Sequence, residues 1–381
     1  MSAREGAGRE GRALVTATSA APARRSRQRR FTAVDVILWA IRIGAVLIIG
    51  FGLFGSVGNF LAGQGPSATA WRDLVVAGLA QGAMYGLIAL GYSMVYGVLG
   101  FINFAHGEVF MAGSLIGFFA ADAMVRGGLW ERNILLALAI LIAVSVTVST
   151  LMAVVIERVA YRRLREAPRL IPLITSIGVS FFIQYSFSGL FGVNVRSYPA
   201  LPGALGGRVS ILGVPIEATK LIVIVVAIIA MIGLFYFVNR TRTGRAIRAV
   251  AEDKEIAALM GIDVDRTIVM TFAVGGAMAG VAGALYGLLF RGIVFYTGFL
   301  PGIKAFTSAV LGGIGNIPGA MAGGVLLGLF EGVGPLLILG GLGIPSVTQL
   351  KDVVAFSALV LMLIFRPSGL FGERIGSEDR A

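Results

Sequence analysis

The sequence contains no cysteine and only one histidine, His106. The lack of cysteine excludes disulfides, thiolate metal sites and a cysteine nucleophile, and a single histidine excludes a metal site built from several histidines in this chain. Charge is also scarce, because 14% of the 381 residues are charged whereas 57% are hydrophobic, and the mean hydropathy is +0.88. Soluble domains rarely carry so little charge, so the sequence predicts a polytopic membrane protein.

Signatures of nucleotide hydrolysis and covalent catalysis are missing as well. The chain has no G-x-x-x-x-G-K-[ST] motif, which excludes ATP binding through a P-loop within it. It also has no G-x-S-x-G elbow and no H-E-x-x-H helix. We therefore expect a protein that is not an enzyme, with no catalytic residue, no cofactor and no metal.

Positive charge is more plentiful than negative charge, and the net charge is +12. Such a balance would suit a nucleic acid, but the arginines and lysines gather in a few loops. Loops rich in these residues stay on the cytoplasmic side of a membrane, so the pattern indicates membrane orientation and no nucleic-acid partner.

Long apolar runs fill most of the chain and predict an all-α fold, a polytopic transmembrane helical bundle of about 10 spans with broken or re-entrant segments. The eighth run is shorter than the roughly 20 residues that cross a bilayer unaided. The runs lie at about Val34–Phe54, Leu74–Val98, Gly107–Val125, Ile134–Ile156, Leu170–Phe191, Leu221–Val238, Thr267–Phe290, Ile303–Ile314, Gly319–Leu339 and Val353–Phe365.

The distribution of basic residues orients these spans. Arginines crowd the loop 157–169 and the segment 239–266, whereas the loop 192–218 holds only Arg196 and Arg208. Starting from a cytoplasmic N-terminus, the count of spans places both basic segments and the C-terminus in the cytoplasm and the loop 192–218 outside.

The beginning of the chain differs from the rest. Residues 1–31 are rich in Arg, Ala, Gly and Ser, which predicts a disordered basic arm that sets orientation or contacts membrane lipid. An extra span and outer loop follow at 32–72, then the main transmembrane domain at 73–372 and a tail at 373–381. A cleaved signal peptide is the alternative, but the first apolar run is too long for one.

The segment Arg240–Arg266 is a polar island between two long apolar runs. Thr243 can cap a helix that starts near Gly244, and Gly261 suits the left-handed residue that closes one. Two apolar stripes at helical spacing suggest one helix, or two short ones, held between two surfaces. The alternative is a basic loop that only fixes orientation.

The segment Gly100–Glu108 combines polar and aromatic residues between two spans. We interpret it as a broken or re-entrant helix in which Asn103, His106 and Glu108 line a cavity or an interface, as unwound segments of transporters do. Asn316 marks a second candidate break. For His106, a hydrogen bond to neighbouring backbone is favoured over proton transfer.

Glycines recur every four residues in three rows, which lets helix backbones approach closely. The rows are Gly78, Gly82 and Gly86; Gly315, Gly319 and Gly323; and Gly324, Gly328 and Gly332. Charged residues within spans cost about 2.5–3.5 kcal/mol each at a helix centre and should face the bundle interior or an aqueous path. The charged residues within or near spans are Arg42, Asp122, Lys304 and Glu331.

Several long stretches, in one order, resemble the permeases of branched-chain amino acid ABC transporters and, within that family, the H-type subunit. The resemblance covers roughly residues 72–372 and leaves out the arm and the first span. The stretches are GLIALGYSMVYGVLGFINFAHGEVFMAG at Gly86–Gly113, IERVAYRRLR at Ile156–Arg165 with RLIPLITSIG at Arg169–Gly178, GRAIRAVAEDKEIAALMGIDVDR at Gly244–Arg266 and KAFTSAVLGGIGNIPGAMAGG at Lys304–Gly324.

The resemblance implies a multi-pass importer subunit of the bacterial inner membrane that forms the translocation path. Its implied partners are a second permease subunit in a heterodimer, two cytoplasmic ATP-binding subunits, a periplasmic substrate-binding protein and a small amino-acid substrate. The substrate would pass near Asn103, with His106, Glu108 and Asn316 as further path residues. Coupling to the ATPases would fall to Gly244, Ala251, Glu252, Ala257, Ala258, Gly261 and Ile262.

Three alternatives stay open. Urea and short-chain amide permeases look similar at this level, so the substrate is less firmly indicated than the class. An ion-coupled secondary transporter would use His106, Glu108 and Asp122 as relays. A structural or enzymatic membrane protein is disfavoured, because the sequence shows no nucleophile–base pair and no metal-binding constellation.

Overall fold

The computed structural model describes residues 33–165, 167–168, 170–211, 213–345, 347–366 and 368–372. The predictions for the arm at 1–31 and the tail at 373–381 lie outside these residues. The chain divides into two compact units, 1–41 and 42–381. Of the first unit, the structure describes residues 33–41, which begin helix α1. All contacts reported below lie within the second unit.

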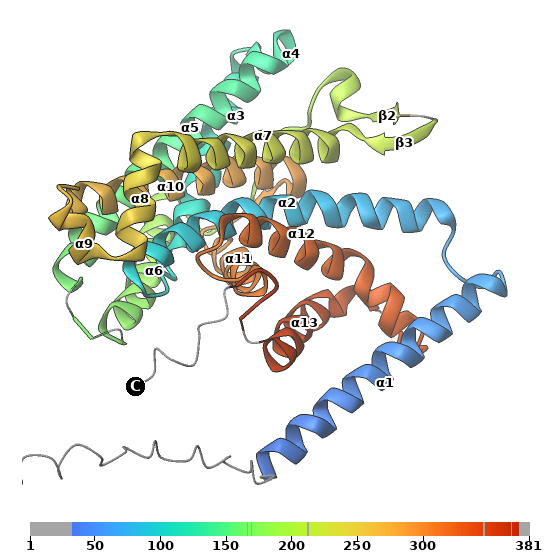
Figure 1. Cartoon of the computed structure of the whole chain (residues 1–381). Helices are drawn as coiled ribbons and strands as arrows, with labels where there is room; N and C mark the ends of the chain where they lie inside the picture. Colours follow the sequence, from blue (N-terminus) through green and yellow to red (C-terminus); the bar gives the residue numbers. More distant parts are fainter. Residues whose placement is uncertain are drawn as a thin grey trace, which may run out of the picture. The chain divides into compact units, whose positions relative to one another are not determined.

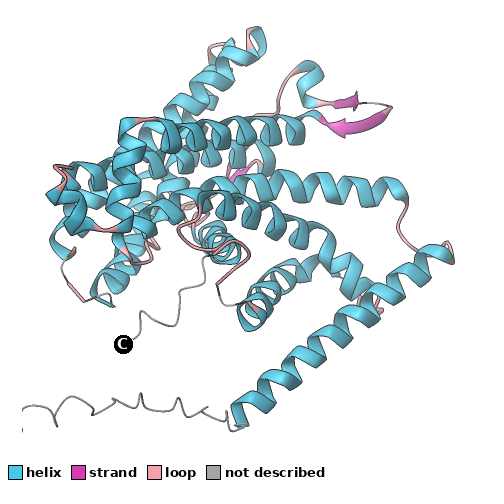
Figure 2. Cartoon of the chain, viewed as in Figure 1, coloured by secondary structure: helices cyan, strands magenta, loops and turns pink. Residues whose placement is uncertain are grey.

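Helices account for most of the described chain and strands for very little, which confirms the all-α prediction (Figures 1 and 2). In the described ranges, nine helices are long and apolar enough to cross a membrane. The last two reach the required length with the helical turns beside them. The helices that form these candidate spans are α1 (Ala33–Leu61), α2 (Ala68–Leu99), α3 (His106–Arg126), α5 (Ile134–Ile156), α6 (Leu170–Phe191), α7 (Ala218–Arg240), α10 (Val264–Phe290), α12 (Ile317–Gly334) and α13 (Lys351–Phe365).

The eighth predicted span corresponds to α11 (Phe299–Gly312), whose 14 residues make it a short apolar helix. At 1.5 Å per residue it is about 21 Å long, which is less than the hydrocarbon thickness of about 30 Å. Among the described residues, the protein is therefore a polytopic helical bundle of nine apolar helices of spanning length and one shorter apolar helix, close to the ten spans expected.

The remaining elements are short and connect the long helices. They are α4 (Leu129–Arg132), α8 (Arg242–Glu252), α9 (Lys254–Leu259), the π-helical turns η1 (Glu157–Tyr161) and η4 (Pro335–Gly340), the 3₁₀ turns η2 (Arg162–Leu164), η3 (Gly203–Gly206) and η5 (Val347–Leu350), and the strands β1 (Arg196–Ser197), β2 (Arg208–Ile211), β3 (Val214–Glu217) and β4 (Gly292–Ile293). The strands form two antiparallel pairs, β1 with β4 and β2 with β3.

Helix α2 lies at the centre of the second unit and packs against α12 along the predicted glycine rows (Figure 1). A Cβ atom added to Gly82 would lie 2.8 Å from the carbonyl oxygen of Gly324. One added to Gly78 would lie equally close to the carbonyl oxygen of Gly328. Any side chain at these positions would force the backbones apart, so the glycines are what permits this contact.

Candidate coupling and transport sites

The polar island folds into two short helices, α8 and α9, and the residue that caps the first of them differs from our prediction. Thr241 is the N-cap of α8, because its backbone is extended and its hydroxyl accepts a hydrogen bond from the Gly244 N–H at 3.0 Å. Thr243 lies inside the first helical turn. Thr241 and Thr243 both precede a segment with apolar residues at helical spacing. The preference for threonine at an N-cap therefore does not tell which of the two is the cap.

Asp253 divides the island. Its carboxylate accepts hydrogen bonds from the backbone N–H groups of Glu255 and Ile256 at 2.8 and 2.9 Å and so caps α9. Helix α9 ends at Leu259 and is closed two residues later by a left-handed Gly261, with φ of +82°, which confirms that prediction. The N–H groups of Gly261 and Ile262 donate to the carbonyls of Ala258 and Ala257, each at 3.0 Å, which is a Schellman arrangement.

One face of the island packs onto the bundle. Ile247, Val250 and Ala257 are buried, and Gly244 fits so closely against α7 that an added Cβ would lie 2.4 Å from the Phe237 carbonyl oxygen. Helix α8 contacts α7, α10 and α2. The first of the two predicted surfaces is therefore the transmembrane bundle itself.

The other face of the island is open and apolar. Ile256, Leu259 and Met260 have 59%, 85% and 77% of their surface exposed. Of the remaining predicted coupling residues, Ala251, Glu252 and Ala258 are exposed and Ile262 is half-buried. Large apolar side chains this exposed on an otherwise charged segment are typical of a surface that another protein covers.

An ion-pair network anchors the neighbouring loop to the start of α10. Arg165 contacts the carboxylates of both Glu157 and Asp265, and Arg162 lies 3.3 Å from Asp265. The Glu157 side chain is completely buried. Burial, followed by the positive charge of Arg165, lowers the pKa of Lys254 in α9, so α9 shares the electrostatic environment of this network.

The polar segment between α2 and α3 is a short non-helical link that is largely buried, and the cavity-lining role expected for it stays a prediction. Asn103 is 3% exposed, and its side-chain oxygen accepts a hydrogen bond of 2.6 Å from the hydroxyl of Tyr161 in η1. The Ser176 hydroxyl of α6 accepts from the Phe104 N–H at 3.3 Å and donates to the Leu173 carbonyl at 2.7 Å, while the Ile102 carbonyl oxygen lies 3.3 Å away. Ser176 of α6 thus satisfies the Phe104 N–H that the break frees, and Tyr161 of η1 holds the Asn103 side chain.

Glu108 and His106 begin α3 and point to different neighbours. The Glu108 carboxylate is fully buried and accepts hydrogen bonds from Gln184 at 2.6 Å and Ser180 at 3.1 Å, both on α6. The His106 ring packs against α2, where its centroid lies 4.8 Å from that of Tyr92. It also hydrogen-bonds the backbone of Ile88, which is the kind of contact that the sequence analysis favoured for it.

Asn316 has a different structural role. Its side-chain oxygen accepts from the Gly319 N–H at 2.9 Å and caps α12, while its amide donates to the Phe371 carbonyl at 3.1 Å. Both ends of the side chain are therefore engaged in local structure. The structure gathers Asn103, His106 and Glu108 in one segment and places Asn316 at another helix start.

A buried charge cluster joins four helices, and the sequence indicated only part of it. The Lys304 ammonium group lies 2.7 Å from carboxylate oxygens of both Glu331 and Asp352. Gln81 donates to the same Glu331 oxygen at 2.7 Å. The predicted inward orientation of Lys304 and Glu331 is confirmed, because their side chains are 6% and 1% exposed. Asp122, in contrast, pairs with Arg126 at the exposed end of α3.

Comparison with known proteins decides the family. The family model described as branched-chain amino acid transport system / permease component matches residues 74–364. The chain belongs to this family. It is therefore a multi-pass membrane permease and a component of a multi-component transporter, not itself an enzyme.

Individual relatives cover most of the chain. It is 46% identical over 310 residues to the high-affinity branched-chain amino acid transport system permease protein BraD of Pseudomonas aeruginosa, which is 81% of this chain and 98% of that protein. It is 42% identical over 298 residues to the permease protein LivH of Escherichia coli K12, which is 78% and 94% of the two chains. A probable LivM permease of Methanocaldococcus jannaschii is 29% identical over 162 residues, 39% of this chain and 46% of that protein. No solved structure matches.

Proposed function

We propose that the chain forms one half of the translocation path of an ATP-driven importer for branched-chain amino acids. Its partners are a second, LivM-like permease, two cytoplasmic ATP-binding subunits and a periplasmic substrate-binding protein. The complex lies in the bacterial inner membrane with both termini of this chain in the cytoplasm. Relatives named for branched-chain amino acid transport along nearly their whole length support the substrate class.

The observation that best supports external ATPases is the apolar face of α9. Ile256, Leu259 and Met260 stand exposed on the island, whose opposite face is fixed to α7 and α10. A partner protein that binds the exposed face of α9 can move α8 and α9 together. The remaining coupling residues, Ala251, Glu252, Ala258 and Gly261, surround the same exposed face, while Gly244, Ala257 and Ile262 connect it to the bundle.

A chain of contacts connects the polar island to the segment Gly100–Glu108. The network of Glu157, Arg165 and Asp265 fixes η1 to the start of α10, and Tyr161 in η1 holds Asn103. We propose that ATP-driven movement reaches the substrate path through these contacts. We propose that Asn103, His106 and Glu108 line the substrate path. Asn316, which caps the start of α12, is the fourth proposed path residue.

The function is tested with the purified complex in proteoliposomes. Uptake of radiolabelled L-leucine should require ATP, the ATP-binding subunits and the binding protein together, and excess L-valine should compete while urea and acetamide should not. Uptake by this chain alone, driven by a proton or sodium gradient, would contradict the proposal and favour the ion-coupled alternative. Competition by urea or acetamide would reassign the substrate.

The docking face has its own test. Leu259→Ser should weaken capture of the ATP-binding subunits by the permease and lower uptake. Val193→Ser is the matched control, because Val193 is an apolar residue 64% exposed on the loop after α6. If Leu259→Ser assembled and transported like the control, α9 would not be the docking surface.

A further inference from the structure

A cavity of about 350 Å³ opens at the end of α10 that lies opposite α8 and α9. It is lined by the β2–β3 hairpin, the start of α7 and the last residues of α10. Its volume lies within the range of about 300–1,000 Å³ that small-molecule sites occupy. A narrower pocket continues it toward the start of α2, and both share Arg208, Glu217 and Lys220.

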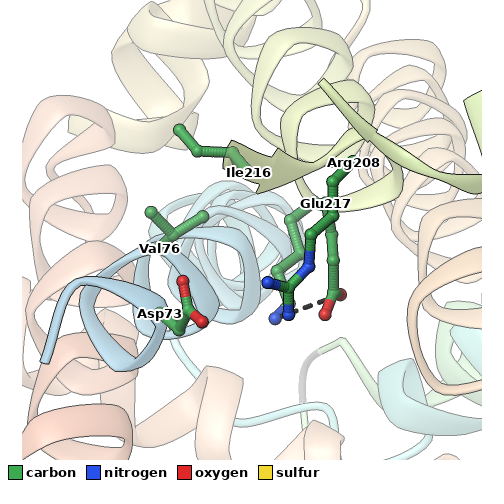
Figure 3. A pocket seen from close by; sticks show the side chains of 6 residues that line it. Asp73, Val76, Arg208, Ile216 and Glu217 are labelled. Carbon is green, nitrogen blue, oxygen red and sulfur yellow. Dashed lines mark ion pairs between the residues drawn. The ribbon is translucent and has the colours of Figure 1, made fainter. Parts of the chain in front are cut away.

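The lining combines charges of both signs with an apolar wall. Arg208, Lys220 and Arg291 supply positive charge, Glu217 supplies negative charge, and Leu288 and Leu289 supply the apolar surface. Figure 3 shows the narrower pocket, where Asp73 of α2 faces Arg208 and Glu217 across the opening. Lys220 is already paired with Glu217 at 3.1 Å.

Arg208 and Arg291 differ from Lys220 because they form no ion pair of this kind within the described residues. Within the described residues, neither Arg208 nor Arg291 donates a side-chain hydrogen bond or forms a salt bridge of 4 Å or less. Arg208 acts on the Asp73 carboxylate only through space. A planar guanidinium group binds a carboxylate through two parallel hydrogen bonds, so these two arginines at one opening suit a carboxylate ligand.

The backbone holds these side chains in place. Arg208 pairs with Glu217 across the β2–β3 hairpin, and the Ala218 N–H donates to the Gly207 carbonyl at 3.0 Å, which ties the hairpin to α7. Arg291 has φ of +59° and is the only non-glycine residue with positive φ in the part of the chain that the structure describes. Its carbonyl accepts from the Tyr198 N–H at 2.8 Å. This left-handed conformation makes Arg291 the C-cap of α10, where its N–H donates to the Gly287 carbonyl at 3.1 Å, so the end of the helix fixes where this arginine lies.

We propose that this cavity binds the zwitterionic backbone of an aliphatic α-amino acid at the entrance to the transport path. Arg208 and Arg291 take the carboxylate, Glu217 or Asp73 takes the ammonium group, and the aliphatic side chain lies against Leu288 and Leu289. The proposal rests on the proposed function for its choice of ligand. The contacts use groups common to all α-amino acids, so the site accepts the class and leaves finer selection to other components.

The test measures binding of radiolabelled L-leucine to the assembled transporter in lipid nanodiscs without the binding protein. The double variant Arg208→Gln/Arg291→Gln should weaken this binding about tenfold or more, since each lost contact is a charge-assisted hydrogen bond. Arg132→Gln is the matched control, because Arg132 is an exposed arginine at the end of α4 that does not line the cavity. It should bind L-leucine like the wild type.

Two analogues separate recognition of the carboxylate from recognition of the ammonium group. L-Leucinamide lacks the carboxylate and N-acetyl-L-leucine lacks the ammonium group, so both should compete poorly with L-leucine in the wild type. The double arginine variant should lose its preference for L-leucine over L-leucinamide. Glu217→Gln combined with Asp73→Asn should lose its preference for L-leucine over N-acetyl-L-leucine.

Several outcomes would overturn the proposal. One is a wild-type transporter without measurable L-leucine binding in this assay, and another is a double variant that binds as the control does. Weaker capture of the binding protein with unchanged L-leucine binding would assign the arginines to carboxylates of that protein instead. The proposed function fails separately, if the wild-type complex with ATP and binding protein imports no L-leucine.

Discussion

The Lys304 ammonium group lies between the carboxylates of Glu331 and Asp352 inside the bundle. Each of these charges is stabilised only while its oppositely charged partner is present. Glu331 is 1% exposed and Asp352 is 40% exposed, so Glu331 depends far more on its partner. Taking one partner from a buried pair leaves an uncompensated charge in a low-dielectric interior, which costs several kcal/mol. The pair therefore fixes how α11, α12 and α13 meet.

Lys304→Met should destabilise the protein by about 3–5 kcal/mol, because Glu331 then lacks its closest cation. The double variant Lys304→Met/Glu331→Leu should recover most of this loss, since it removes both buried charges. Lys351→Met is the control, because Lys351 is 46% exposed and 3.8 Å from Glu331, and should change the free energy of unfolding by less than about 1 kcal/mol. Thermal unfolding of the purified protein measures all three. A single variant as stable as the wild type would show that the pair contributes little.

At the residue scale, the sequence indicated which polar groups are buried but not what they bind. Lys304 and Glu331 were predicted to face inward because hydropathy marks any charge inside an apolar run. Their partner Asp352 stands at the edge of its run and gave no such signal. Tyr161 was missed as the partner of Asn103, since 58 residues separate them and Tyr161 sits among arginines that read as an ordinary basic loop.

At the element scale, hydrophobic runs of spanning length predicted every long helix, because the requirement to satisfy backbone groups in lipid leaves few other solutions. Local patterns also predicted the left-handed Gly261 and the short α11. The two-residue strands β1 and β4 could not be predicted, because they are too short to show periodicity and pair across almost a hundred residues. The π-helical turns have no sequence signature to detect.

The contact between α2 and α12 gives an element-scale prediction. Gly82→Ala should lower the apparent Tm, since the new Cβ would lie 2.8 Å from the Gly324 carbonyl oxygen and 2.9 Å from Val325. We expect a loss of about 1–3 kcal/mol, as for other overpacked interiors. Gly233→Ala in α7 is the matched control, because no atom lies within 4 Å of its added Cβ. Equal Tm values for the two variants would remove the packing argument.

The end of α9 gives a second prediction at this scale. Gly261→Pro should abolish most uptake while the assembled complex still hydrolyses ATP. Proline cannot adopt φ of +82°, and it lacks the N–H that donates to the Ala258 carbonyl. Gly261→Asn should retain uptake, since asparagine tolerates the left-handed conformation. The measurement compares ATP hydrolysis with L-leucine uptake in the same proteoliposomes, and normal uptake by the proline variant would contradict the coupling role.

At the scale of the whole molecule, one helix connects the two proposed sites. α10 begins beside α8 and the Asp265 ion pairs, and it ends at Leu288 and Leu289 in the cavity wall. Its 27 residues span about 40 Å, which is enough to cross a bilayer. A rigid helix of this length transmits a displacement at one end to the other, so the proposed ATPase docking and the proposed amino-acid entry would act on the same element from opposite sides of the membrane.

This arrangement requires the island and the hairpin to lie on opposite sides of the membrane, and the absence of native cysteine makes that requirement simple to test. Glu255→Cys in α9 and Ser210→Cys in β2 each place a single thiol at an exposed position. In cells whose outer membrane is permeable to it, a maleimide that cannot cross the inner membrane should label Ser210→Cys and should label Glu255→Cys only after the inner membrane is opened. The positive-inside distribution of arginines predicts this order. The reverse order would place the docking surface outside the inner membrane, where no ATP-binding subunit could reach it. Labelling of both thiols before the inner membrane is opened would place both segments on the outer side and would equally contradict the arrangement.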